Sequence, residues 1–175
     1  DGYRLGGTAA FGALTALRLG LRPGIVTSFA PGLDAGHAAL DVPLHTVPSA
    51  ATTTFHNTYP QGMRVQHLRI VASPIPPPDV PREWRSAPMV LLGPVAGNVS
   101  FDLARWFPRS LVVASLQGWL RRWESDGRVV PRYWDGQEVL PYVDAAVVSI
   151  EDVEDRGLIA AWAEIAPLLI VTRGA

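Results

Sequence analysis

The strongest constraint on the fold is an alternation of short apolar runs and helix-like stretches that begins near residue 87. We predict strands at 89–92, 111–114, 129–134, 145–150 and 168–172. Between them we predict helical stretches at 100–107, 117–124, 138–142 and 151–166. This alternation favours an α/β fold, in which helices cover both faces of a parallel sheet. Ligands of such sheets bind beyond the carboxyl ends of the strands, so residues that follow a strand are the first site candidates.

The earlier part of the chain contains two segments with different sequence patterns. Residues 8–19 predict a helix ending at Gly20, and residues 24–29 predict a short buried strand. The segment 41–72 is rich in Thr, Val and His, and its period-2 stretches predict a small antiparallel sheet or hairpin. Prolines between 74 and 81 form a stiff linker. We therefore expect one domain over 1–175, with an insert at approximately 41–72.

Composition excludes several classes of function. The formal net charge is -1, which argues against electrostatic binding of nucleic acid or of an anionic membrane over a broad surface. No apolar run reaches the roughly 18 residues needed to span a membrane. The chain has no cysteine, so thiolate chemistry is excluded. All 15 basic residues are arginines, which excludes a Walker-type phosphate loop and Schiff-base catalysis, because both need a lysine.

Two candidate sites lie at predicted helix starts. Gly6 and Gly7 precede the first helix, where a ligand could touch backbone and free N–H groups, or where they could simply form a tight turn. Ser149 and Asp152 follow a strand, where the carboxylate could hold a Mg²⁺ shell near phosphates. The alternative for this second pair is an ordinary N-cap with an acidic first turn.

Two further candidates have equally plain alternatives. Thr172 and Gly174 follow the last strand and could line a nucleotide site, or merely end the strand. Arg64 and the polar stretch 52–57 could face a substrate, or form the solvent side of a hairpin. The four histidines show no spacing typical of a metal site.

Taken in order, these segments resemble the PfkB (ribokinase-like) carbohydrate kinases. The resemblance rests on the segments 6–14, 19–21, 25–27, 90–94, 148–152 and 170–175. Thr-Thr-Thr-Phe at 52–55 and Gln-Gly-Trp-Leu at 117–120 are similar to an inositol-kinase-like branch. The order of the motifs covers nearly the whole chain.

The resemblance implies a three-layer α/β/α sandwich with a small β lid, truncated here at both ends. It implies transfer of the γ-phosphate of ATP to a hydroxyl of a sugar or polyol, with Mg²⁺. Gly6 and Gly7, with Arg64 and Asn98, are expected near the substrate. Ser149, Asp152, Thr172 and Gly174 are expected near the nucleotide, with Asp152 acting on Mg²⁺ indirectly. A cytoplasmic protein that dimerises through its lid is also implied.

The sequence departs from the family pattern at two motifs. Ser149 and Asp152 stand where the family has Asn and Glu, and Phe11 stands where sugar-binding members often carry Asn. Aspartate keeps an acid in place but is shorter than glutamate, so its reach toward a metal ion differs from that in the family.

A further departure concerns the catalytic segment of the family. The Gly-Ala-Gly-Asp motif, whose Asp is the general base and whose N–H groups form the anion hole, does not occur in these 175 residues. The resemblance places this general base beyond Ala175, so we expect no catalytic residue among residues 1–175. We therefore expect this chain on its own to be inactive, because phosphoryl transfer depends on positioning and charge stabilisation at the phosphate.

Two other functions stay open at this point. The chain could be a non-catalytic ligand- or nucleotide-binding module derived from the kinase fold, which the departures at Phe11 and Ser149 favour. It could also be a Rossmann-like oxidoreductase or transferase, although the glycine fingerprint of that class is absent.

Overall fold

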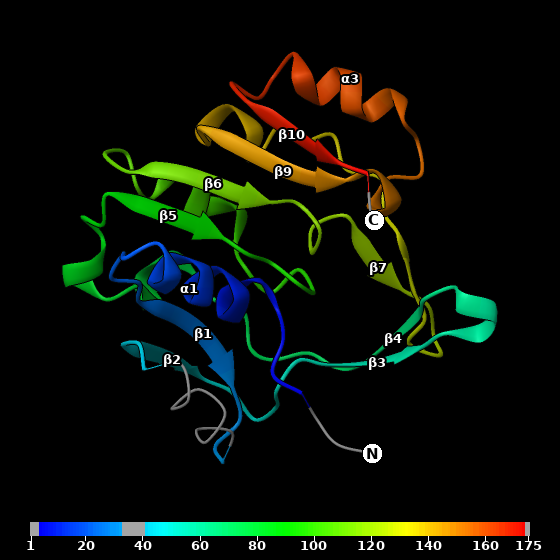
Figure 1. Ribbon diagram of the computed structural model, residues 1–175, viewed down its shortest axis with the longest axis horizontal. Helices are drawn as coiled ribbons and strands as arrows, with labels where there is room; N and C mark the ends of the chain where they lie inside the picture. Colours follow the sequence, from blue (N-terminus) through cyan, green and yellow to red (C-terminus); the bar gives the residue numbers. More distant parts are fainter. Residues whose placement is uncertain (1–3, 33–40, 174–175) are drawn as a thin grey trace.

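The computed structural model describes residues 4–32 and 41–173. Its main sheet has four strands, which are all parallel and lie in the order β10-β9-β6-β5. These are β5 (Met89–Leu92), β6 (Leu111–Ser115), β9 (Ala145–Ser149) and β10 (Leu169–Thr172). The four arrows point the same way, so their carboxyl ends share one edge of the sheet (Figure 1). The predicted parallel α/β sheet is confirmed.

A second parallel pair follows the first helix. α1 (Thr8–Arg18) ends before Gly20, whose φ of 75° is the left-handed conformation expected of a glycine at a helix end. β1 (Ile25–Phe29) then pairs with β2 (Leu44–Pro48). β2 lies inside the segment 41–72, so only the later part of that segment forms the expected hairpin. An apolar alternation shows that a strand exists but does not identify its partner.

That hairpin consists of β3 (Thr54–Thr58) and β4 (Val65–Ile70), which are antiparallel and joined through η1 (Pro60–Gly62). A second hairpin, β7 (Arg121–Trp123) and β8 (Val129–Pro131), lies against it. The two are linked by an antiparallel bridge between His67 and Arg128 and by a 2.8 Å hydrogen bond from the Leu68 N–H to the Gly127 carbonyl. Figure 1 shows both hairpins projecting together from the main sheet.

The predicted helix at 117–124 is wrong. Residues 117–120 form a turn, and 121–123 are a strand that pairs with 129–131. The cause is the Asp126-Gly127 dipeptide, a strong hairpin signal, with Gly127 at a φ of 87°. The spacing of Trp119 and Trp123 resembled a helix face, but only Trp119 is buried.

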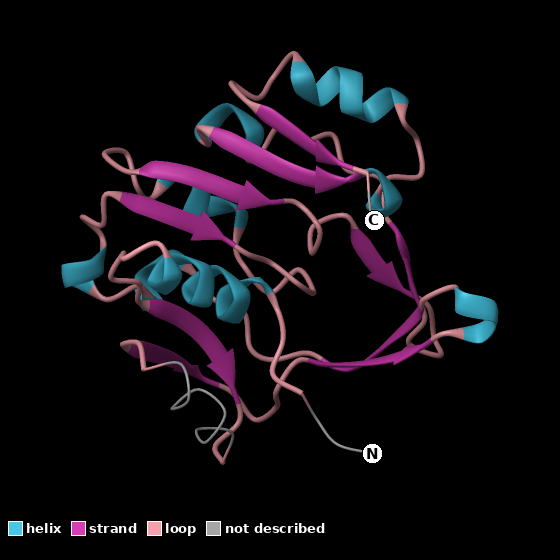
Figure 2. Ribbon diagram, in the orientation of Figure 1, coloured by secondary structure: helices cyan, strands magenta, loops and turns pink. Residues whose placement is uncertain are grey.

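The remaining connections are mostly single helical turns, drawn in cyan in Figure 2. The predicted helix at 151–166 is much shorter than expected, because the turn η6 (Ile150–Asp152) and a bend after it precede the helix α3 (Gly157–Ala163). Ser100 caps the turn that begins at Phe101, since its Oγ accepts a hydrogen bond from the Asp102 N–H. The turns and helix are η2 (Pro77–Asp79), η3 (Arg82–Trp84), η4 (Phe101–Arg105), η5 (Leu140–Tyr142), η6 (Ile150–Asp152) and α3 (Gly157–Ala163).

An aromatic cluster lies at the centre of the core. Trp134 is within 6.0 Å, centroid to centroid, of Phe101, Trp119 and Trp162. Trp162 anchors α3 beside the main sheet and is 0% exposed. On the other flank, a Cβ at Gly12 of α1 would lie 2.8 Å from Leu91 of β5, so α1 packs closely on that strand. Among the described residues, no helix is long and apolar enough to cross a membrane.

Candidate functional site

The start of α1 meets the loop that follows β5. A Cβ at Gly93 would come within 2.7 Å of Thr8, and one at Gly7 would lie 3.7 Å from Val95. Gly7 has a φ of 87°, a conformation that side chains disfavour. Apart from Gly6 and its two chain neighbours, no atom of residues 4–32 and 41–173 lies within 4 Å of the position that a Cβ at Gly6 would take. The backbone at Gly6 therefore borders open space, beside the carboxyl end of β5.

The loop after β5 is packed against the loop after β6. A Cβ at Gly118 would overlap the Pro94 carbonyl and the Val95 nitrogen, so only glycine allows this approach. The indole N–H of Trp119 donates to the Val99 carbonyl at 2.9 Å. These contacts fix the carboxyl ends of β5 and β6 relative to each other.

Asn98 lies in the same loop. Its carbonyl accepts a 2.8 Å hydrogen bond from the Ile75 N–H, which fixes the backbone. Its side-chain Oδ1 is buried and has no hydrogen-bond partner within residues 4–32 and 41–173. A buried polar atom without a partner is costly, so this oxygen is a candidate ligand-binding group.

Ser149 and Thr172 lie opposite each other at the ends of β9 and β10. The Ser149 Oγ accepts from the Glu151 N–H at 3.3 Å, which is the N-cap geometry weighed above as the alternative. The Thr172 hydroxyl donates to the Val148 carbonyl at 3.4 Å. Gly174 and Ala175 lie outside the described residues. The expected nucleotide contact of Gly174 and the general base expected beyond Ala175 therefore stay predictions.

Asp152 lies at the centre of the polar contacts at this edge. Its carboxylate accepts from the Gln117 Nε2, at 3.1 Å to Oδ2 and 3.5 Å to Oδ1. It also accepts from an Nη of Arg121, at 3.3 Å, in an ion pair whose side chains are only 12% and 8% exposed. Asp152 thus joins the end of β9 to the loop after β6.

Burial lowers the pKa of the Arg121 guanidinium, whereas the adjacent Asp152 acts to raise it. The charge of Arg64 acts in the same direction as burial, which places Arg64 within electrostatic reach of Arg121. An arginine nevertheless stays protonated in a protein, so this site carries a buried positive charge at neutral pH.

Arg64 comes from the β3–β4 hairpin and borders a hollow of about 180 Å³. Arg121, Arg128, Glu151 and Asp152 line the same hollow. Two of the sequence candidates, Arg64 and Asp152, are therefore brought together. The sequence did not indicate Gln117, Arg121 or Arg128 as site residues, although Gln117 and Arg121 follow β6 at the sheet edge where ligands were expected.

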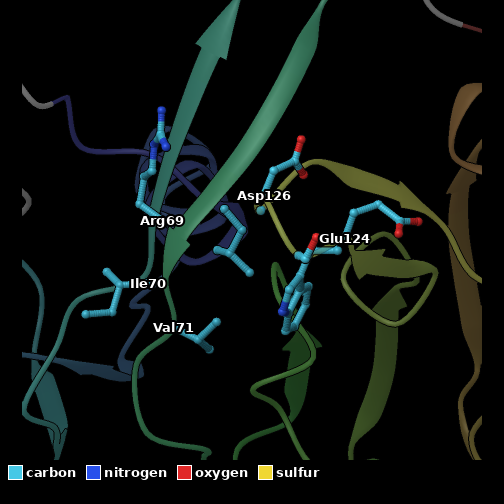
Figure 3. A pocket seen from close by; sticks show the side chains of 9 residues that line it. Arg69, Ile70, Val71, Glu124 and Asp126 are labelled. Atoms are coloured by element: carbon cyan, nitrogen blue, oxygen red, sulfur yellow. The ribbon is translucent and has the colours of Figure 1, made fainter.

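A second hollow, of about 330 Å³, lies between β4 and the turn that joins β7 to β8 (Figure 3). Its charged groups contact other parts of the protein: Arg69 lies 3.2 Å from a ring nitrogen of His56, and Asp126 accepts from the Arg128 N–H. Glu124 is paired with Arg122. Two of its charged side chains, Arg69 and Glu124, are therefore already engaged by other side chains.

The described residues contain no cluster of three or more His, Asp or Glu side chains that could hold a metal ion. A divalent cation at the carboxyl edge would therefore depend mainly on oxygens supplied by a ligand, with one or two carboxylates from the protein. This arrangement is usual for Mg²⁺ bound with phosphates.

No family model and no curated protein sequence matches the chain. Solved structures do match. One is a pyrophosphate-dependent kinase in the ribokinase family complexed with sulfate, with a TM-score of 0.80 and 23% identity. The match covers 95% of this chain and 64% of that one. The chain thus spans just under two thirds of that kinase.

A pyrophosphate-dependent kinase of the ribokinase family, complexed with a pyrophosphate analogue and myo-inositol, matches with a TM-score of 0.81 and 23% identity. That match covers 100% of this chain and 68% of the other. A microbiome-derived acarbose kinase matches with a TM-score of 0.56 and 16% identity, over 95% of this chain and 56% of that one. The chain therefore has a ribokinase-like α/β fold that is partial relative to these kinases, as the resemblance implied.

Proposed function

We propose that this chain forms the main part of a kinase that transfers a phosphoryl group to a hydroxyl of a sugar or cyclitol. The observation that carries the proposal is the contiguous carboxyl edge. There the open backbone at Gly6, the Asn98 oxygen without a partner among the described residues and the largely buried Asp152 are joined by packed loops. Polar groups of this kind, held by a rigid sheet, suit positioning and charge stabilisation.

Gly6, Gly7 and Asn98 form the acceptor side of the proposed site. A polyol hydroxyl could approach the bare backbone at Gly6, and the Asn98 Oδ1 could accept its hydrogen bond. The solved complex with myo-inositol, in a kinase of the same fold, supports a cyclitol as the first acceptor to test.

Ser149, Asp152, Thr172 and Gly174 form the proposed donor side. ATP is the donor implied by the family resemblance, whereas three of the matching structures are described as those of pyrophosphate-dependent kinases. Both donors therefore belong in the test. Mg²⁺ would neutralise charge on the donor phosphates. Because both Asp152 oxygens are engaged by Gln117 or Arg121, Asp152 would act on the ion through water, while Glu151 has an exposed carboxylate.

The test is phosphoryl transfer by the full-length protein in the presence of Mg²⁺ and either ATP or pyrophosphate. The transfer is monitored by ³¹P NMR. The acceptors are myo-inositol and a panel of sugars. Transfer to one acceptor supports the proposal, and Gly6→Ala should then raise the KM for that acceptor while leaving the fold intact. The 175-residue chain should show no turnover, because it lacks the Gly-Ala-Gly-Asp segment.

The second candidate is a non-catalytic binding module with the same fold. It is favoured by Ser149, whose hydroxyl caps the following turn, and by the engagement of Asp152 in an ion pair. Binding of a polyol or a phosphate donor by the full-length protein, without transfer in the NMR assay, would select this candidate.

We also propose that two copies pair through the β3–β4 hairpin. Tyr59, Met63 and Ile70 on this hairpin are 63%, 65% and 49% exposed, which is unusual for large apolar side chains on one small element. Sedimentation of the wild type and of Met63→Glu should show a dimer and a monomer respectively. A monomeric wild type contradicts this pairing.

A further inference from the structure

The hollow beside Asp152 is built from three separate parts of the chain. Arg64 precedes β4, Arg121 and Arg128 belong to the β7–β8 hairpin, and Glu151 and Asp152 follow β9. The His67–Arg128 bridge holds β4 against the second hairpin, so the three guanidinium groups are gathered by backbone pairing rather than by flexible loops. Its volume of about 180 Å³ is below the ~300–1,000 Å³ range of drug-sized ligands, which suits a small anion.

The three arginines around this hollow differ in whether a carboxylate partner compensates their charge. Arg121 is buried and paired with Asp152. Arg64 and Arg128 are exposed, and within residues 4–32 and 41–173 neither guanidinium has an ion pair or a side-chain hydrogen bond. Two free arginines thus flank a third that is fixed in position. Arginine forks match the oxygens of phosphate groups, and several together bind polyphosphates well.

We propose that this hollow binds the phosphoanhydride of the donor as its Mg²⁺ complex, with Arg64 and Arg128 contacting the phosphate oxygens. The inference rests on the proposed function, which it deepens by naming the groups that hold the donor. Arg121 is a positioning residue: its charge is compensated by Asp152, and their ion pair fixes one wall of the hollow. The exposed Glu151 carboxylate offers an oxygen to the accompanying cation. Arg64 is thereby assigned to the donor rather than to the acceptor, where the sequence had suggested it.

The hairpin that carries Arg64 supplies a matched control. Arg69 lies on β4 of the same hairpin and is exposed, but it borders the other hollow (Figure 3). Its guanidinium contacts His56. Arg64→Met and Arg69→Met remove the same charge from the same hairpin. A general electrostatic effect weakens anion binding equally in both variants, whereas a built site distinguishes them.

The experiment is calorimetric titration of the full-length protein, and of Arg64→Met, Arg128→Met and Arg69→Met, with pyrophosphate in Mg²⁺. Circular dichroism checks that each variant is folded. We expect the Kd to rise about 10-fold or more for Arg64→Met and Arg128→Met, the usual effect of losing a charge-assisted hydrogen bond. Arg69→Met should change the Kd by less than about 3-fold, as expected of an exposed charge outside the site.

Parallel titrations with ATP and with adenosine identify the source of the phosphoanhydride. Pyrophosphate bound more tightly than ATP assigns the hollow to the free anion, and the reverse order assigns it to the tail of a nucleotide. Adenosine affinity should be the same in the wild type and Arg64→Met. The proposal is overturned if the wild type binds neither phosphate compound at millimolar concentration, or if Arg64→Met and Arg128→Met bind like Arg69→Met.

The outcomes also separate this inference from the proposed function. If phosphoryl transfer occurs but the donor KM of Arg64→Met equals that of the wild type, the kinase stands and the arginine site is wrong. If no transfer occurs but both arginine variants lose pyrophosphate affinity, the anion site stands and the kinase is wrong.

Discussion

The buried pair of Arg121 and Asp152 allows a prediction of stability that is independent of activity. In Asp152→Ala, the Arg121 guanidinium loses its carboxylate partner while it stays 8% exposed. Removing one partner of a buried ion pair costs about 3–5 kcal/mol, since the remaining charge is desolvated without compensation. Asp152 is 12% exposed, so solvent screening reduces this cost little, and we expect a loss near the lower end of the range.

The double variant Arg121→Met/Asp152→Leu separates this cause from simple loss of packing. It replaces both charges by apolar groups of similar length, which is often neutral for a buried pair. Gln117 is half-buried and can turn its amide to water once Asp152 is gone. We therefore expect the double variant to recover most of the stability that Asp152→Ala loses.

Urea unfolding followed by tryptophan fluorescence measures both changes, because the chain has 6 tryptophans and Trp119 is buried close to the pair in sequence. The reasoning is refuted if Asp152→Ala loses less than about 1 kcal/mol, the size of an exposed pair. It is equally refuted if the double variant is as unstable as the single one.

Two further variants test the packing that holds the site. Gly118→Ala should lower the free energy of unfolding in urea by about 1–3 kcal/mol, because the added Cβ overlaps the Pro94 carbonyl. Gly6→Ala serves as its control: its added Cβ enters open space, so the free energy of unfolding should stay within about 0.5 kcal/mol of the wild type. Trp162→Ala should lose about 3–5 kcal/mol, since the side chain is 0% exposed. Trp162→Phe should lose less than half of that, because the buried indole N–H has no partner to lose among the described residues; equal losses would contradict this account.

The main sheet could be predicted from the sequence because each strand is a short apolar run beside a helical stretch. β5, β6, β9 and β10 all begin and end within two residues of the predicted bounds. The β3–β4 hairpin could also be predicted, since the alternation of apolar and polar residues that indicates it is local. These signals lie within about ten residues, the range over which periodicity is informative.

The site could be predicted only in part, because its decisive contacts are long-range. Arg121 and Asp152 are 31 residues apart in the chain, and no local pattern indicates that they meet. The helix wrongly predicted at 117–124 also hid Arg121, since the spacing of Trp119 and Trp123 suggested a helix face where the Asp126-Gly127 turn instead produces a hairpin. Asn98 was expected near the substrate, but the lack of a partner for its side-chain oxygen among the described residues follows only from the packing around it.

The bond between Leu68 and Gly127 has a mechanical consequence. A hairpin attached only at its two ends could tilt without disturbing the rest of the molecule. Here a backbone hydrogen bond and the neighbouring bridge tie β4 to the segment that leads into β8. A continuous series of contacts therefore runs from the projecting hairpin through β8 to β7 and Arg121, and from there through Asp152 to the end of β9. The two projecting hairpins and the charged side chains at the sheet edge therefore belong to one connected set of contacts.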